Sequence, residues 1–253
     1  MKTGFSKESL YGNKLSLVSP HPASPSSPHP TPLWIGLRAA KANLIPGMIV
    51  QAAMLALGLA YYYYAPAKEG LEQLATLKKE WGYGFAFVSG AIAGGVLPEI
   101  LTVAVFQRGR VERKNIENLL FGVLYWGSQG IMVDAFYRAQ AWMFGSQANF
   151  LTIVKKVLVD QFLYTPFNAL HLAQATYEWK KAGYRVSGFT HTLTRRFFVQ
   201  ETFPAIVAAW GVWIPLVSII YSLPSPLQVP FFSLALTFWV MIFTWINYHA
   251  ARK

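Results

Sequence analysis

The sequence predicts an all-α integral membrane protein, a helical bundle with about six transmembrane helices. Its 253 residues are 54% hydrophobic and only 13% charged, which is about half the charged fraction of a typical soluble domain. The apolar residues also lie in long blocks without a formal charge, which the core of a soluble protein does not need. Each block is long enough for a membrane span of about 20 residues.

The formal net charge of +11 is carried by short basic clusters between the apolar blocks. This distribution fits the excess of Lys and Arg in loops on the cytoplasmic or matrix side, and it lacks the single basic face of a nucleic-acid binder. We therefore expect the lipid bilayer as a partner and no nucleic acid. The chain has no cysteine, which excludes disulfides, thiol nucleophiles and thiolate metal ligands.

The composition divides the chain into three regions. Residues 1–33 are rich in Ser, Pro and His, cannot bury a core, and are predicted to be disordered. An organelle-targeting leader and a plain tail both fit this region. Residues 34–79 hold an additional first span, within 42–67, and a polar linker whose charges have helical spacing. Residues 80–253 hold the main membrane bundle.

The other spans follow from the remaining long apolar blocks, which contain few charged residues. We expect them at 81–107, about 118–143, 156–177, about 203–222 and about 229–249. A polar loop is expected between the fourth and fifth of the six spans, as far as Gln200, and a proline-rich turn between the last two. With both termini inside, most of the basic clusters then lie on one side of the membrane.

The fourth predicted span carries an acid where hydrocarbon is expected. Asp160 is the only formal charge between Lys156 and Tyr177, Gln161 follows, and Pro166 is predicted to break the helix. A carboxylate inside a bilayer is costly, so it is expected to face other helices or a water-filled cavity. Asp160 and Gln161 are therefore candidates for lining a polar pathway. The alternative is that Asp160 only pairs with a neighbouring helix.

Three further features lie in the second and third predicted spans. Glu99 is another pathway-lining candidate, with a structural hydrogen bond to backbone groups near a proline as the alternative. Asp134 and Arg138 are four residues apart, so we expect a salt bridge across one helical turn. Gly90 and Gly94 have the small-xxx-small spacing that lets two helices pack closely.

The sequence gives no basis for a metal site, a cofactor or a catalytic group. The five histidines are scattered without paired spacing, and no phosphate-cradling glycine loop is present. His171 is better interpreted as a packing histidine than as a ligand. A membrane-embedded enzyme would need a convergence of acids and histidine that no spacing singles out.

The motifs nevertheless resemble a known family. Lys156, Asp160, Gln161 and Pro166 match the Lys-xxx-Asp-Gln-xxxx-Pro signature of the Mpv-seventeen family, which includes the twenty-two-kilodalton peroxisomal membrane protein. The segment 210–215 is similar to the family's late Trp-xx-Trp-Pro block, with the proline displaced by one position. The resemblance covers roughly residues 80–253 and indicates a distant member.

The resemblance implies a function class rather than a substrate. Members of this family are small integral proteins of the mitochondrial inner membrane, peroxisomes and related membranes, associated with channel-like passage of small solutes or ions. For this chain it implies such passage across an organelle membrane or a bacterial inner membrane, and no enzymatic activity. A structural scaffold and a membrane-embedded enzyme are the alternatives, and assembly as a homo-oligomer stays open.

Overall fold

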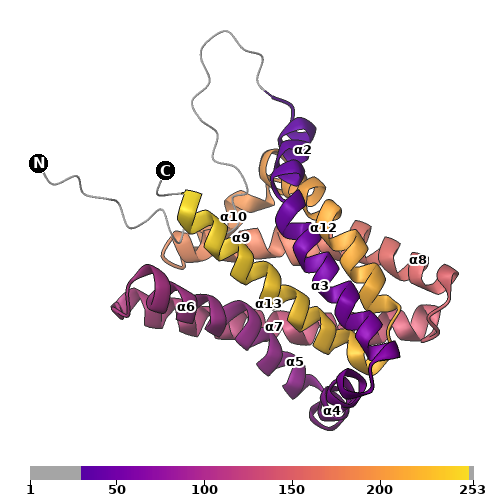
Figure 1. Cartoon of the computed structure of the whole chain (residues 1–253). Coiled ribbons are helices and arrows are strands. Elements are labelled where there is room, and N and C mark those ends of the chain that lie inside the picture. Colours follow the sequence, from indigo (N-terminus) through magenta and orange to yellow (C-terminus); the bar gives the residue numbers. More distant parts are fainter. Residues whose placement is uncertain (1–29, 251–253) are drawn as a thin grey trace, which may run out of the picture. The chain divides into compact units, whose positions relative to one another are not determined.

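The computed structural model describes residues 30–250, without the side chains of 243–250, and this part of the chain forms helices and no strand (Figure 1). Its helices confirm the predicted all-α class. Five of them are long and apolar enough to cross a membrane: Leu44–Tyr63, Tyr83–Phe106, Arg113–Phe144, Arg195–Tyr221 and Ser225–Ile242. Residues 1–29 of the predicted disordered tail lie outside the described residues.

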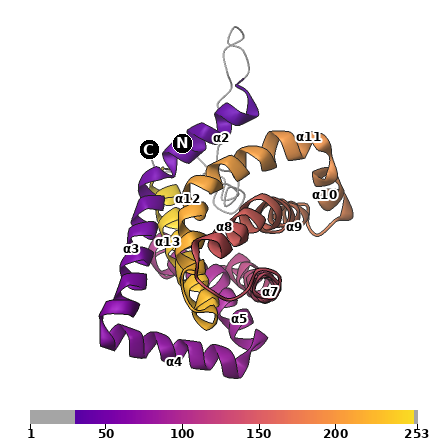
Figure 2. The ribbon, with the colours of Figure 1, turned by 90° about the vertical axis from the view of Figure 1, so that its right-hand side faces the viewer.

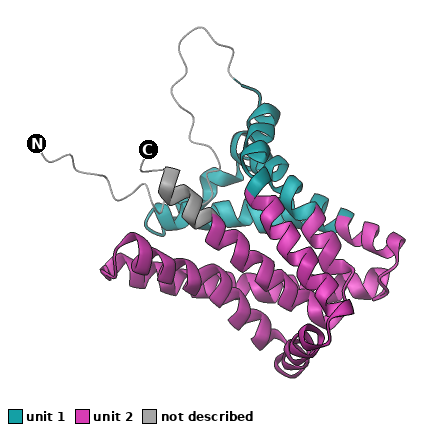
Figure 3. Ribbon diagram, in the orientation of Figure 1, with its two compact units in different colours: residues 1–45, 158–214 teal, residues 46–157, 215–253 magenta. Residues whose placement is uncertain are grey.

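The chain forms two compact units, which Figure 3 shows in different colours. The smaller unit comprises residues 1–45 and 158–214, and the larger unit comprises residues 46–157 and 215–253. Their boundaries fall inside helices α3, α8 and α12. The predicted division of the chain at residues 33 and 79 stays a prediction.

In the larger unit, α3 (Leu44–Tyr63) is followed by α4 (Ala65–Trp81), and the two helices meet at a corner (Figure 2). Helix α4 corresponds to the predicted polar linker. Its buried residues, Leu71, Ala75 and Lys78, recur every three or four positions and so form one inward face. The helix ends at Gly82, whose φ of 55° is a conformation that favours glycine.

The second span of the larger unit is a helix with two wide turns. It runs through α5 (Tyr83–Gly90), the π-helix η1 (Ala91–Val96), α6 (Leu97–Leu101) and the π-helix η2 (Thr102–Phe106). Helix α7 (Arg113–Phe144) packs along α5 and η1, and α13 (Ser225–Ala250) packs against α4, η1 and α7. The predicted bounds 81–107 agree closely with the second span, whereas α7 and α13 start several residues before the predicted positions of about 118 and about 229.

A capping box fixes the start of α7. The Glu112 side chain accepts from the backbone of the third helical residue, and the Asn115 side chain accepts a 2.6 Å hydrogen bond from the Glu112 N–H. The helix has 32 residues, about 48 Å at 1.5 Å per residue, whereas the hydrocarbon core of a bilayer is about 30 Å thick. The ends of α7 are therefore expected to extend into the interfacial regions.

The smaller unit begins with α2 (Pro32–Ala42), capped by Thr31, whose hydroxyl accepts from the N–H of Trp34. A capping threonine and a proline at the helix start favour a helix here, and α2 begins at Pro32, close to the predicted end of the tail at about residue 33. The other helices of this unit follow in chain order: η3 (Asp160–Leu172), α9 (Ala173–Lys181), α10 (Val186–Thr190), η4 (His191–Leu193), α11 (Arg195–Phe197), η5 (Phe198–Thr202) and the start of α12 (Phe203–Tyr221).

The prediction of a polar loop as far as Gln200 is wrong, because this segment is mostly helical. Most of its residues are helical: α9 extends to Lys181, and short helices follow after a turn at Gly183 and Tyr184, which both have positive φ. One of them, α11, starts at a side-chain cap: the Thr194 hydroxyl accepts from the N–H of Phe197.

The helix that contains Asp160 also differs from its prediction. The chain is helical through α8 (Phe150–Val159), η3 and α9, but this helix is not among the five apolar enough to cross a membrane, since Asp160, Gln161, Asn168 and His171 interrupt its apolar residues. The sixth span stays a prediction. Pro166 does not break the helix: η3 is a continuous π-helix, whose wider turns accommodate the missing N–H.

Candidate functional site

The first candidate cluster lies in the smaller unit, at the start of η3. Asp160, Gln161 and Thr165 are 5%, 1% and 6% exposed. The Gln161 amide donates to Asp160 Oδ1 over 2.8 Å and to the Thr165 hydroxyl over 3.3 Å, and this hydroxyl donates to Asp160 Oδ1 over 3.3 Å. The three side chains therefore form a closed polar triangle. Among the described residues, Gln161 Oε1 has no hydrogen-bond partner.

The wide helix also explains a contact that the sequence did not reveal. In a π-helix the carbonyl of Gln161 would accept from the N–H of residue 166, but Pro166 has none. The indole N–H of Trp210, on α12, donates to this carbonyl instead, over 3.0 Å. The rings of Phe162 and Trp210 lie 4.9 Å apart beside this bond. Trp210 thus holds η3 in place by satisfying a carbonyl that proline leaves without a donor.

The second candidate, Glu99, lies in the larger unit on α6 and is 6% exposed. The Asn115 amide donates a 2.5 Å hydrogen bond to Glu99 Oε1, and Asn115 is itself 3% exposed. Since Asn115 belongs to the first turn of α7 and to its capping box, Glu99 lies level with the start of the third span. The carboxylate joins two consecutive spans near one end of each.

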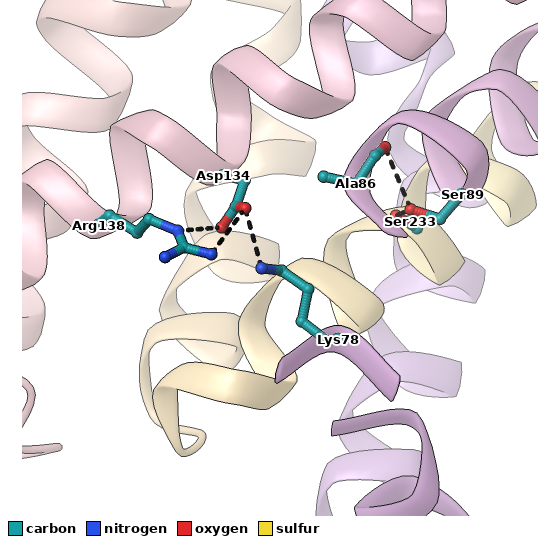
Figure 4. A network of polar contacts seen from close by, with 6 residues as sticks. All are labelled: Lys78, Ala86, Ser89, Asp134, Arg138 and Ser233. Carbon is teal, nitrogen blue, oxygen red and sulfur yellow. Dashed lines mark hydrogen bonds and ion pairs between the residues drawn. The ribbon is translucent and has the colours of Figure 1, made fainter. Parts of the chain in front are cut away.

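A third polar cluster joins α4 to α7 (Figure 4). Arg138 Nε lies 3.1 Å from Asp134 Oδ1, and Lys78 Nζ lies 2.9 Å from Asp134 Oδ2. The side chains of Lys78 and Asp134 are 7% and 4% exposed, whereas that of Arg138 is 55% exposed. The guanidinium group also lies over the ring of Tyr83, at 5.0 Å. Lys78 is thus the buried partner of Asp134. It lies on α4, so the four-residue spacing that predicted the Asp134–Arg138 pair could not reveal it.

Figure 4 also shows a neutral contact in the larger unit: the Ser233 hydroxyl of α13 donates to the Ser89 hydroxyl of α5 over 3.0 Å, and Ser89 donates to the Ala86 carbonyl. Hydroxyl groups of this kind satisfy each other's hydrogen-bonding capacity between apolar helices.

Glycines bring the second span into close contact with α7. A Cβ atom added to Gly90 would lie 3.2 Å from the Cα of Gly130, and one added to Gly95 would lie 2.6 Å from the carbonyl carbon of Gly122. A Cβ on Gly94 would overlap the Trp126 ring. The backbones therefore approach too closely for side chains at these positions. The third predicted span also contains three glycines, Gly122, Gly127 and Gly130, and these were the sequence signal for the side of the contact that α7 contributes.

His171 packs in the smaller unit rather than beside an acid. Its Nδ1 lies 3.1 Å from the hydroxyl oxygen of Thr202, and this hydroxyl donates to Gln174 Oε1 over 2.6 Å. The ring also makes edge contacts with Phe197 and Phe198. Within the described part of the chain, no three His, Asp or Glu side chains are grouped so that they could hold a metal ion.

The structure thus groups the predicted residues in separate places. Asp160 and Gln161 lie together in the smaller unit, whereas Glu99, the Asp134–Arg138 pair, Gly90 and Gly94 belong to the larger unit. In comparisons with protein-family models, with curated proteins and with solved structures, no match to this chain was found.

Proposed function

We propose that this membrane protein provides a channel-like path for small solutes or ions. The observation that carries the proposal is the polar triangle of Asp160, Gln161 and Thr165, which is almost fully buried in a proline-containing π-helix. Wide helical turns of this kind occur frequently at functional sites. A buried carboxylate and an amide oxygen that still has acceptor capacity can replace part of the hydration shell of a cation.

Glu99 supports the same proposal from the other unit. It is a second buried acid on a helix long and apolar enough to cross a membrane, and acids in such places often mark ion or proton pathways. The resemblance of residues 156–166 to the Mpv-seventeen signature points in the same direction, and it suggests an organelle membrane as the location.

A structural scaffold is the second candidate, and a specific observation favours it. Glu99 accepts from Asn115, Asp134 pairs with Lys78 and Arg138, and Asp160 accepts from two neighbours in its own helix. Each acid therefore has polar partners within its own unit. Acids satisfied in this way can hold helices together without contacting a solute.

Flux from proteoliposomes separates the two candidates. We expect purified protein to release a small cation such as K⁺ from loaded vesicles, and Asp160→Asn or Glu99→Gln to slow this release by at least about tenfold. Glu69→Gln removes an exposed acid on α4 and is the matched control, expected to leave the flux unchanged. Size-exclusion chromatography and circular dichroism establish that each variant is folded. Folded variants with the flux of the wild type, or a wild type without flux, would favour the scaffold.

A further inference from the structure

Among its described residues the larger unit contains two buried lysines, and only one of them has a carboxylate partner. Lys78 is 5% exposed and pairs with Asp134. Lys156 is 1% exposed, and among the described residues it has no ion-pair partner; its ammonium group lies 5.7 Å from the centre of the Tyr221 ring. Burial without a counter-charge is costly for an ammonium group, because the charged form loses its hydration.

A second polar side chain in this unit is buried without a partner. Gln140, on α7, is 0% exposed, and neither its amide nitrogen nor its amide oxygen has a hydrogen-bond partner among the described residues. Buried amide groups are nearly always satisfied, since an unsatisfied one costs free energy comparable to a lost hydrogen bond. Its burial therefore needs an explanation, as does that of Lys156.

A hydrogen bond near the link between α7 and α8 relates the positions of these two residues. The Thr152 hydroxyl of α8 donates to the Phe144 carbonyl at the end of α7, over 3.5 Å. One helical turn is 3.6 residues, so four residues back along α7 lead to Gln140, and four residues forward along α8 lead to Lys156.

Tyr221 independently places Lys156 beside the same part of α7. The Tyr221 ring, which the Lys156 ammonium group approaches, lies 5.1 Å from the ring of Tyr137. Tyr137 precedes Gln140 by three residues and therefore shares its helix face. The Thr152–Phe144 hydrogen bond and the contacts of the Tyr221 ring thus both relate Lys156 to the part of α7 that contains Gln140.

We propose that Lys156 and Gln140 form a buried binding site for a small anion. The ammonium group supplies the positive charge and the Gln140 amide N–H supplies a second donor, which is the combination that halide, carboxylate and phosphate ions accept. The site does not depend on the proposed passage of cations, because it uses neither Glu99, Asp160 nor Gln161. All of its residues belong to the larger unit.

Anion-dependent stability of the full-length protein in nanodiscs tests the site. Thermal unfolding is followed by tryptophan fluorescence in chloride, acetate or phosphate, each against gluconate, a larger anion, at equal ionic strength. We expect at least one of the three small anions to raise the wild-type midpoint saturably, by roughly 3–6 °C at about ten times its dissociation constant. Equilibrium dialysis with that anion, radiolabelled, should give about one ion per chain.

Three variants make the test specific. Lys156→Met removes the charge at similar length, and we expect it to abolish both the anion-dependent shift and the bound ion. Gln140→Glu supplies a carboxylate at the level of Lys156, so it should raise stability in gluconate and exclude the added anion. Lys155→Met removes the exposed neighbouring lysine and should behave as the wild type.

Three outcomes would overturn the proposal. The first is a folded wild type whose midpoint does not respond to any of the three small anions, which would indicate a neutral lysine. The second is an equal response in Lys155→Met and Lys156→Met, which would indicate general surface binding. The third is undiminished anion binding by folded Gln140→Glu. Loss of cation flux plays no part in these readouts, so this test and the test of the proposed function fail independently.

Discussion

The ion cluster between α4 and α7 allows a quantitative prediction. Asp134→Asn removes the negative charge but keeps the shape, and it leaves the Lys78 ammonium group buried without a counter-ion. The side chains of both residues are less than a tenth exposed, at 7% and 4%, and their charged atoms are 2.9 Å apart. Breaking one side of such a pair costs about 3–5 kcal/mol of unfolding free energy.

Arg138→Gln is the contrasting variant in the same cluster. The arginine side chain is 55% exposed, so water compensates much of the lost charge, and we expect a cost below about 1 kcal/mol. The double variant Lys78→Met with Asp134→Leu removes both buried charges. It should recover most of the stability lost in Asp134→Asn, because no unpaired charge remains.

Reversible unfolding in mixed micelles, monitored by circular dichroism, measures all three costs. The reasoning would be refuted if Asp134→Asn and Arg138→Gln cost the same, since burial would then not decide the energy. It would also be refuted if the double variant cost as much as the sum of Asp134→Asn and Lys78→Met measured separately.

The other predictions concern packing and the π-helix. Trp210→Phe keeps the ring against Phe162 but leaves the Gln161 carbonyl without its donor, so we expect a loss of about 1–3 kcal/mol in the same unfolding assay, and an unchanged stability would contradict this role. Gly95→Ala places a methyl group against the Gly122 backbone and should lower the unfolding free energy by about 1–3 kcal/mol. A Cβ atom at Gly84 has no atom within 4 Å, so Gly84→Ala should be neutral or slightly stabilising. Equal effects at both positions would contradict the close packing of the second span against α7. Lys156→Met should remove the anion dependence of unfolding that Lys155→Met keeps.

Much of the fold could be predicted from the sequence, because a membrane span is determined mainly by the length of an apolar block along the chain. A span needs an apolar block of a given length with few charges, and the charged residues Glu80 and Arg108 mark the two ends of one such block directly. The start of α2 was less visible: the helix begins at Pro32, within the last two residues of the predicted tail, because a threonine cap and a proline outweigh the low complexity around them.

The candidate site was predictable only where both partners lie on one helix. Asp134 and Arg138 are one turn apart, so their pairing follows from helical geometry. Lys78 is 56 positions from Asp134, and Trp210 is 49 positions from Gln161, so no local pattern relates either pair. The effect of Pro166 was misjudged for a similar reason: a missing N–H predicts a broken helix unless a distant indole can satisfy the freed carbonyl.

The central claim is that the protein conducts small cations and that this depends on its buried acids, and single-channel recording in planar bilayers tests it most directly. In a KCl gradient we expect the wild type to show discrete currents whose reversal potential indicates a preference for K⁺ over Cl⁻. Asp160→Asn or Glu99→Gln should move that potential towards zero, whereas Glu69→Gln should not. A folded wild type that passes no current, or acid variants with an unchanged reversal potential, would contradict the claim.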